Sequence, residues 1–283
     1  MNASAPFRYP GAKNQLAEWI ISTFPPHRTY VEPFLGSGAV FFRKGPSASE
    51  YLGDQDRFVV RFFQVLRQQP DALAYALRCT PYAREEYHTA DLHADLEDVE
   101  FARRFVIAQQ MSIGGSAGQR SRAGWRHDGV TRGRSGTITQ WQNLPERVQA
   151  CAARLLDVHV ECLDAVDLIT RLAGPDVLIY ADPPYPDEVR SRSGTRGRLY
   201  REEMQDQAGH VRLLAALRAH PGPVVLSGYP CPLYDENLPG WRRLDRAALA
   251  DGGNERVEAL WVNAPVQAHL DASAAPVSPG LFD

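Results

Sequence analysis

Short apolar runs alternate along this chain with segments in which apolar residues recur at helical spacing. A short apolar run bounded by Gly and Pro indicates a buried strand, whereas apolar residues three or four positions apart indicate an amphipathic helix. A strand is predicted to end near residue 32, with further strands at residues 49–54, 158–163, 177–180, 224–226 and 259–262. Helices are predicted at residues 57–69, 164–172 and 210–219, and the segment after the glycine turn at 36–38 reads as the start of another.

Residues 70–154 show a mainly helical pattern that is interrupted by a Gly-, Ser- and Arg-rich loop. Strands and helices that alternate around one long insertion predict an α/β fold: a doubly wound sheet carrying an inserted, mainly helical domain. The sheet domain would comprise residues 1–69 and 155–263, with the insertion at 70–154 between them. The Ala-, Ser- and Pro-rich tail at residues 264–283 is predicted to be disordered.

The composition is that of an ordinary soluble globular protein, and 283 residues suffice for one large α/β domain with a modest insertion. No apolar run approaches the roughly 18 residues of a membrane-spanning helix, and the first residues lack the features of a signal peptide. The four cysteines show no C-x-x-C spacing. This favours reduced thiols in a cytoplasmic protein and gives no sign of a metal site.

The net charge of −3 gives no global sign of nucleic-acid binding, but two segments are locally basic. Residues 112–136 hold five arginines and one acidic residue, and residues 186–201 hold five arginines and two acidic residues. Both are interleaved with Gly, Ser and Thr, which is typical of loops. We expect the first loop to read DNA, because arginine neutralises phosphates and pairs with guanine, although a solvated loop would look the same. The arginines proposed for this role are Arg120, Arg122 and Arg126.

The sequence Asp182-Pro183-Pro184-Tyr185 directly follows the predicted strand at 177–180. It would therefore lie at the carboxyl edge of the sheet, where open α/β sheets bind ligands. The prolines make the backbone rigid, the carboxylate can accept hydrogen bonds from an amine, and the aromatic ring can stack on a flat base. These groups suit an enzyme that holds an exocyclic amine, although Asp-Pro-Pro is also a common turn.

A second group of candidate residues follows the predicted strand end at residue 32. Phe34, Gly36 and Gly38 form a turn in which glycine allows positive φ and close approach of a ligand. The pattern lacks the third glycine of G-x-G-x-x-G and the lysine of a Walker A loop. Asp54 lies 16 residues after Gly38, near the position where an acid after the second strand binds a ribose. An adenosyl ligand without phosphates fits best; the alternative is a plain glycine turn with an aspartate N-cap.

Across residues 7–263 the chain resembles the Dam-type (class alpha) DNA adenine N-6 methyltransferases, a bacterial and phage-encoded family. Residues 7–16 (FRYPGAKNQL) resemble the first cofactor motif of that family, residues 32–38 (EPFLGSG) the second, and residues 182–185 (DPPY) the catalytic motif. Supporting segments are residues 53–56 (GDQD), 162–164 (CLD), 226–229 (LSGY) and 256–260 (RVEAL). Their order, with an insertion before the catalytic strand, is also that of the family. The resemblance implies a Rossmann-like methyltransferase sheet whose insertion recognises the DNA target.

The resemblance also implies S-adenosylmethionine as the methyl donor. Tyr9 and Lys13 would contact it, Lys13 through the methionine carboxylate. Asp54 would bind the ribose, and Asp164 the amino group of the cofactor's adenine. The chain departs from the family pattern in two places, with Gly11-Ala12 where Gly-Gly is frequent and Asp56 where asparagine is frequent.

The expected reaction is methylation of the N-6 amine of an adenine flipped out of double-stranded DNA. The Asp182 carboxylate and the Pro183 carbonyl would accept hydrogen bonds from the amine, and Tyr185 would stack on the base. No metal is required. The alternatives are a methyltransferase that acts on the cytosine N-4 amine or on RNA, and a catalytically silent DNA-binding relative.

The remaining expectations concern partners and location. We expect a monomer in the cytoplasm that associates with the nucleoid through DNA and has no membrane partner. The end of the tail, with Leu281 and Phe282, loosely resembles peptides that dock on bacterial sliding clamps, but it lacks their upstream glutamine, which favours a chance tail. The basic loop at residues 186–201 would follow the phosphates that flank the target.

Overall fold

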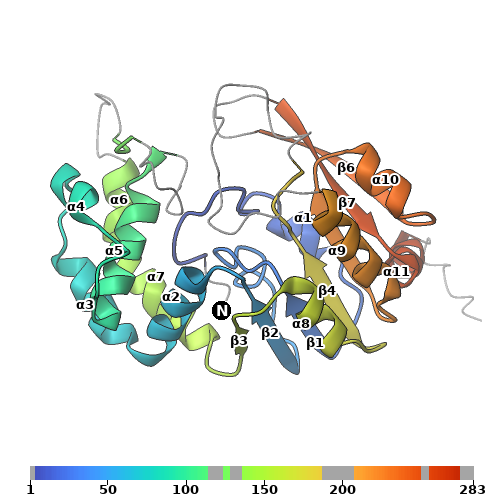
Figure 1. Cartoon of the computed structure of the whole chain (residues 1–283), viewed down its shortest axis with the longest axis horizontal. Helices are drawn as coiled ribbons and strands as arrows, with labels where there is room; N and C mark the ends of the chain where they lie inside the picture. Colours follow the sequence, from blue (N-terminus) through green and yellow to red (C-terminus); the bar gives the residue numbers. More distant parts are fainter. Residues whose placement is uncertain (1–3, 114–123, 128–135, 187–206, 250–254, 275–283) are drawn as a thin grey trace, which may run out of the picture.

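The computed structural model describes residues 4–113, 124–127, 136–186, 207–249 and 255–274. Within these ranges the strands form one seven-stranded sheet in the order β3-β2-β1-β4-β5-β7-β6 (Figure 1). They are β1 (Thr29–Glu32), β2 (Ser49–Gly53), β3 (His159–Glu161), β4 (Val177–Ala181), β5 (Val224–Gly228), β6 (Arg242–Leu249) and β7 (Glu255–Val262). The first five are parallel, and β7 runs antiparallel to β5 and β6. The predicted doubly wound sheet is confirmed.

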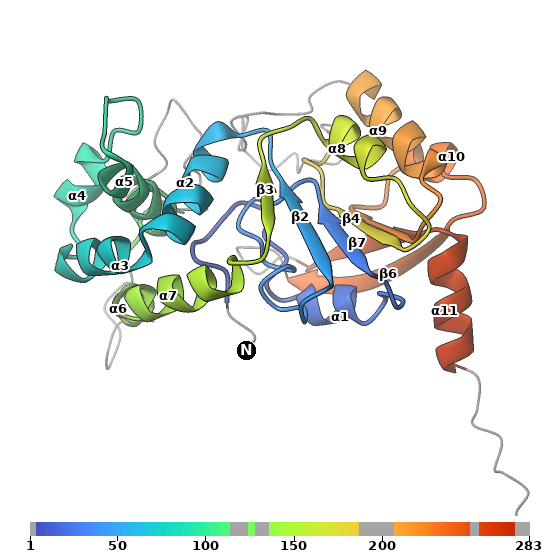
Figure 2. The ribbon, with the colours of Figure 1, turned by 90° about the horizontal axis from the view of Figure 1, so that it is seen from below.

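Helices cover both faces of this sheet. The helices outside the insertion are α1 (Ala17–Ile21), α2 (Arg57–Gln68), α8 (Ala165–Arg171), α9 (Gln207–Ala219), α10 (Pro232–Asn237) and α11 (Ala264–Ala274). Figure 2 shows α1 on one face and α8, α9 and α10 on the other. Alternate side chains of β4 therefore enter two cores: Leu178 and Tyr180 pack with α1, whereas Ile179 and Ala181 pack with α8 and α9. The uninterrupted apolar run of β4 reflects burial on both faces.

The insertion gathers beside the sheet, on the left of Figure 1. Its helices are α3 (Pro70–Cys79), α4 (Arg84–Thr89), α5 (Asp98–Gln110), α6 (Gly136–Gln142) and α7 (Leu144–Arg154). Phe7 from the N-terminal segment packs edge-on against Phe62 of α2 and Phe105 of α5, with ring centroids 4.9 and 5.0 Å away. The hydrophobic core is thus continuous from the sheet into the insertion. The division into domains at residues 70 and 154 stays a prediction.

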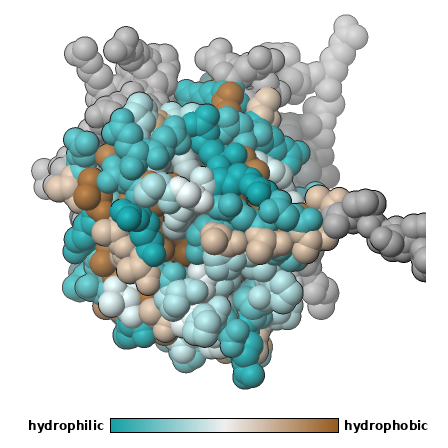
Figure 3. Space-filling view, turned by 90° about the vertical axis from the view of Figure 1, so that its right-hand side faces the viewer, coloured by the Kyte–Doolittle hydropathy of each residue, from teal (hydrophilic) through white to brown (hydrophobic). Residues whose placement is uncertain are grey.

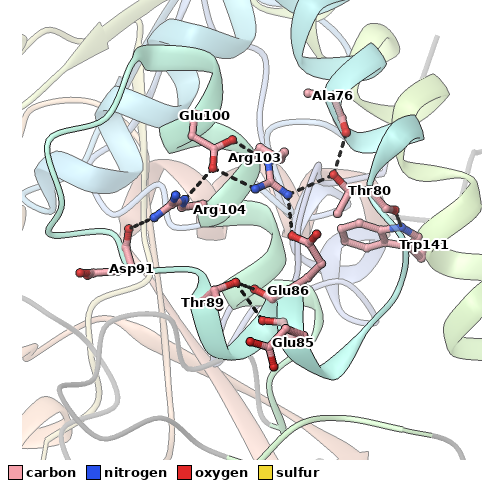
Figure 4. Close-up of polar contacts among 10 residues, drawn as sticks. All are labelled: Ala76, Thr80, Glu85, Glu86, Thr89, Asp91, Glu100, Arg103, Arg104 and Trp141. Atoms are coloured by element: carbon pink, nitrogen blue, oxygen red, sulfur yellow. Dashed lines mark hydrogen bonds and ion pairs between the residues drawn. The ribbon is translucent and has the colours of Figure 1, made fainter.

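Arg103 of α5 ties three helices of the insertion together (Figure 4). Its guanidinium donates hydrogen bonds to Glu86 of α4 at 2.8 Å, to the Thr80 hydroxyl at the end of α3 at 3.1 Å, and to Glu100 in its own helix at 2.7 and 2.9 Å. Hydrogen bonds from Arg103 and Arg104 lower the pKa of Glu100 to about 2. Bidentate, charge-assisted bonds of this kind hold the helices in a defined arrangement.

Most predicted elements are present, but the sequence does not predict α1, α10 or β6, and the segment after β1 differs from the prediction. The sequence does not reveal β6, because it is an edge strand whose residues from Arg242 to Ala247 are exposed or half-buried, so no apolar run marks it. The helix expected after the glycine turn is also wrong. Residues 33–43 make turns instead, held by hydrogen bonds from the Phe42 amide to the Gly38 carbonyl and from the Lys44 amide to the Val40 carbonyl.

The prediction that the whole tail is disordered is wrong for its first part. Residues 264–274 form α11, with Val266 fully buried and Leu270, one turn later, packed against the same core. The Gln267 side chain donates to the Gly240 and Val262 carbonyls at 2.9 and 3.0 Å. Alanine has the highest helix propensity, and one apolar pair with a place to pack suffices to dock this alanine-rich segment. Leu281 and Phe282, for which docking on a sliding clamp is considered, lie outside the described residues.

The molecular surface seen in Figure 3, on the side of α10 and α11, is mainly hydrophilic. Hydrophobic residues are scattered among the coloured residues there and form no extended area. Scattered apolar side chains of this kind are ordinary on a protein surface. None of the helices in the described ranges is long and apolar enough to cross a membrane.

Candidate active site

A cavity opens at the edge of the sheet where the parallel strands end. It lies beside β1 and β4, at the point where the strand order reverses, which is where open α/β sheets bind their ligands. Its volume is about 840 Å³, including space open to solvent. The walls comprise residues 9–13, 32–37, 39–40, 54–56 and 164–165, together with Tyr180, Asp182 and Pro184.

The predicted cofactor residues meet at this cavity from separate parts of the chain. Those that line it are Tyr9, Lys13, Phe34, Gly36, Asp54 and Asp164. Gly38 does not line it. Its φ of +69° and the proximity of the Phe42 ring, 2.9 Å from where a Cβ would lie, give it a conformational role in the turn.

Gly36 is where the glycine turn touches the first predicted motif. Its φ is +50°, and a Cβ at this position would lie 2.9 Å from the ring of Tyr9. Its amide donates to the Asp54 carboxylate at 2.8 Å. A side chain at residue 36 would therefore both strain the backbone and displace Tyr9 from the cavity wall. Gly36 therefore holds together three parts of the chain: the turn after β1, the acid after β2 and the N-terminal motif.

The acids of the cavity wall are also anchored by backbone amides. Asp54 accepts from the amides of Gly36 and Asp56 at 2.8 Å each. Asp164 is the N-cap of α8, where one carboxylate oxygen accepts from the Val166 amide at 2.9 Å. Its second oxygen accepts from the Arg212 guanidinium at 2.6 Å. Both carboxylates are thus oriented, and each is a hydrogen-bond acceptor that faces the cavity.

The predicted catalytic turn is joined to the N-terminal motif by a buried lysine. The Lys13 ammonium donates to the Gly11 carbonyl at 2.9 Å, to the Tyr185 hydroxyl at 2.5 Å, and to the Asp182 carboxylate at 2.9 to 3.0 Å. Ser227, near the end of β5, also donates to the Oδ1 atom of Asp182, at 2.6 Å. The Asp182 carboxylate therefore keeps one orientation before any substrate arrives.

Two groups of the cavity have shifted pKa values that matter for ligand charge. Burial raises the pKa of Glu32 to about 8. The hydrogen bond that Glu32 accepts from the Tyr30 hydroxyl at 2.7 Å lowers this pKa, but by less than burial raises it. Burial also raises the pKa of Asp54 to about 7, against the backbone hydrogen bonds that it accepts. Lys13 behaves differently: burial alone would lower its pKa, but the nearby carboxylates of Asp182 and Glu258 raise it, so Lys13 stays charged.

The sequence assigns no role to several residues of the site. Glu32 begins the segment at residues 32–38, and an acid at the end of an apolar strand is itself a signal of function. Ser227 and Glu258 lie in the supporting segments, and only the fold shows that they reach the catalytic turn. Glu258 of β7 accepts from the Tyr185 hydroxyl at 3.2 Å.

The predicted DNA-reading arginines are only partly described. Arg120 and Arg122 lie outside the described residues, as does the basic loop at 187–201. The Arg126 amide donates to the Met111 carbonyl at 2.7 Å, and the Arg126 guanidinium donates to the Gln140 side chain of α6 at 3.3 Å. An isolated bridge joins Ser112 to Trp125, the residue before Arg126. The backbone and the guanidinium of Arg126 are thus both held in place.

Comparison with known proteins identifies the class to which this fold and site belong. The family model of the D12 class N6 adenine-specific DNA methyltransferases matches residues 9–233, which contain the cavity and the catalytic turn. The chain belongs to this family. Adenine-specific methylation of DNA follows from that membership, and the resemblance seen in the sequence is confirmed.

Two further comparisons add less. No match was found among curated protein sequences. A solved structure described as a putative methyltransferase yhhF from Escherichia coli is similar at 12% identity and a TM-score of 0.37. The similarity covers 93% of this chain and 92% of that one, and at this level it supports no argument about function.

Proposed function

We propose that this protein transfers a methyl group from S-adenosylmethionine to the N-6 amine of an adenine flipped out of double-stranded DNA. The observation that supports the proposal is the excess of acidic over basic side chains in the cavity wall. Among its described wall residues, five are acidic and Lys13 is the only lysine or arginine. The acids are Glu32, Asp54, Asp56, Asp164 and Asp182.

This wall fits an adenosyl ligand that is cationic and has no phosphate. Carboxylates accept hydrogen bonds from hydroxyl, amino and ammonium groups, whereas a phosphate would need amides or cations that are scarce here. Asp54 would hold the ribose hydroxyls, Asp164 the adenine amino group, and Tyr9, Phe34 and Gly36 would line its path. S-adenosylmethionine supplies a methyl group already activated by its positive sulfur.

The catalytic turn would prepare the adenine amine. The lone pair of this amine is delocalised into the ring, so the group is a poor nucleophile. Hydrogen bonds from its protons to Asp182 and to the Pro183 carbonyl would favour the pyramidal form, which is more nucleophilic. Stacking on Tyr185 would offset part of the cost of unstacking the base, which is a few kcal/mol. Lys13 and Ser227 would keep Asp182 oriented, so catalysis would come mainly from positioning.

DNA would bind on the side of Arg126, whose position is fixed by its contacts with Met111 and Gln140. We propose that Arg120 and Arg122 act with it. Because these arginines would neutralise phosphates, binding should weaken as the salt concentration rises. We also propose that the protein acts as a monomer.

Methyl transfer to defined nucleic acids tests the proposal. The purified protein is incubated with tritiated S-adenosylmethionine and unmethylated double-stranded DNA, and the DNA is digested for nucleoside analysis. We expect label in N-6-methyl-2′-deoxyadenosine, and none in matched RNA. Label in N-4-methyl-2′-deoxycytidine or in RNA would favour the rival methyltransferases. Absence of label together with intact DNA binding would favour a catalytically silent relative.

Binding of S-adenosylmethionine should tighten as the pH rises from 6 to 8. Glu32 carries a proton at neutral pH because its pKa is about 8, well above the usual value for glutamate. A cationic ligand favours the ionised form, so binding releases a proton and is favoured by higher pH. Asp54, with a pKa of about 7, acts in the same direction. Titration calorimetry should show the dissociation constant falling about tenfold over this range.

The matched variant for this experiment is Glu32→Gln, which keeps the size of the side chain but cannot ionise. The amino group of the ligand titrates equally with both proteins, so their difference isolates Glu32. In the variant, the affinity for S-adenosylmethionine should no longer rise with pH near 8, where Glu32 ionises. It should still rise with pH near 7, where Asp54 ionises. Identical pH dependence in the two proteins would exclude Glu32 from ligand binding.

A further inference from the structure

The hydroxyl of Tyr185 lies between an ammonium group and a carboxylate. It accepts a hydrogen bond from Lys13 at 2.5 Å and donates one to Glu258 at 3.2 Å. An ammonium group can only donate, and a phenol has a single proton. The proton of Tyr185 is therefore directed towards Glu258, and the two bonds together fix the outer end of the ring.

The ring of Tyr185 is also fixed from the side. Tyr229, just after β5, packs against it with the ring centroids 4.3 Å apart and a 43° angle between the planes. Arg256 of β7 donates to the Tyr229 hydroxyl at 3.0 Å. The backbone before Tyr185 is stiffened by Pro183 and Pro184. Backbone, ring face and hydroxyl are thus restrained by three different segments.

Glu258 lies close to several of the groups that surround the Tyr185 hydroxyl. It lies on β7, beside the antiparallel pair of Gly228 and Ala259, and so reaches the carboxyl edge of the sheet from the opposite direction to β4. Its side chain is half-buried, and it interacts with Lys13 and Asp182 as well as with Tyr185. A hydrogen bond to a charged acceptor in such surroundings is stronger than one between neutral groups.

We propose that Glu258 is a positioning residue for methyl transfer: it anchors the Tyr185 hydroxyl and so holds the ring at the angle that the flipped base requires. The inference rests on the proposed function, in which the base stacks on Tyr185. Glu258 does not touch the reacting atoms. Its effect passes through the hydroxyl of Tyr185, so removing that hydroxyl should make Glu258 unimportant.

A double-mutant cycle tests this coupling. Glu258→Leu and Tyr185→Phe should each lower kcat about tenfold, because loosened positioning is costly for transfer. The double variant should also be about tenfold slower, rather than about 100-fold, because both changes break the same hydrogen bond. Glu258→Gln keeps an acceptor oxygen and should retain kcat within about threefold. KM for S-adenosylmethionine should change little in all of them.

The fluorescence of a modified target base distinguishes positioning of the Tyr185 ring from a merely structural role of Glu258, because only the first should change the stacking of the base. DNA with 2-aminopurine at the target adenine should be bound equally tightly by Glu258→Leu and the native protein, with less quenching of the flipped base in the variant. Val257→Ala is the matched control, since Val257 is the neighbouring residue and is 46% exposed. It should behave as the native protein, and thermal unfolding should confirm that all variants are folded.

Other outcomes would overturn the inference. Additive losses in the double variant would mean that Glu258 acts apart from the Tyr185 hydroxyl. A defect in Glu258→Gln as large as that in Glu258→Leu would mean that its charge matters, as a counter-ion of Lys13, and that anchoring does not. Tyr185→Ala separates these failures from failure of the proposed function. Normal methylation by Tyr185→Ala would refute stacking itself, whereas loss of methylation there with additive losses in the cycle would refute only the role of Glu258.

Discussion

Replacing Asp182 with asparagine should lower kcat for DNA methylation about 1,000-fold, the scale seen when one essential polar group of an active site is removed. The carboxylate is an acceptor on both oxygens, and in the structure it accepts from Lys13 and Ser227 while lining the cavity. The amide of asparagine places a donor on one side. That donor would face either the lysine or the adenine amine, both of which also donate. The variant should therefore fail to hold the amine.

The measurement is single-turnover methyl transfer to a DNA of known target, together with calorimetry for the cofactor. S-adenosylmethionine should bind within a few-fold of its native affinity, because Asp54, Asp164 and Tyr9 are unchanged. Asp167→Asn is a matched control, since Asp167 is an exposed aspartate of α8 that does not line the cavity. Near-native turnover by Asp182→Asn would remove Asp182 from the mechanism.

Replacing Lys13 with methionine should lower kcat about 100-fold, the cost of misplacing a catalytic group by about 1 Å. Lys13 is 5% exposed and bonds to both Asp182 and Tyr185, so it positions two of the groups proposed for catalysis. Methionine matches the apolar stem of lysine but has no charge. Without the ammonium, Asp182 and Glu258 would have no cation between them, and their mutual repulsion would displace the Asp182 carboxylate.

This change should be visible in the rate more than in cofactor binding. Titration calorimetry should show that Lys13→Met binds S-adenosylmethionine within a few-fold of the native affinity, because Asp54, Asp164 and Tyr9 are unchanged. Arg61→Met is the control, since it removes another ion-paired cation, on α2 and outside the cavity wall. A loss of cofactor affinity with an unchanged kcat would assign Lys13 to cofactor binding alone, as the family resemblance suggests.

Local features of the sequence determined much of the fold and part of the site. β4 and β5 are apolar runs because both faces of the central strands are covered, and such runs are visible without any tertiary information. Gly36 is similarly visible, since its positive φ requires glycine wherever the turn is placed. The motif at 182–185 owes its position to β4, which it follows directly. These signals are local because each depends on residues adjacent in the chain.

Tertiary structure decided which of these parts meet. Lys13 reads as a cofactor ligand in the sequence, yet it is ion-paired with Asp182, 169 residues away. Glu258 and Ser227 join the catalytic turn only because β5 and β7 pair beside β4. β6 and α11 have no local signature, since one is a half-exposed edge strand and the other is docked by Val266 and Leu270. Their stability comes from contacts between distant segments, and a pattern read along the chain contains no information about those contacts until the sheet order is known.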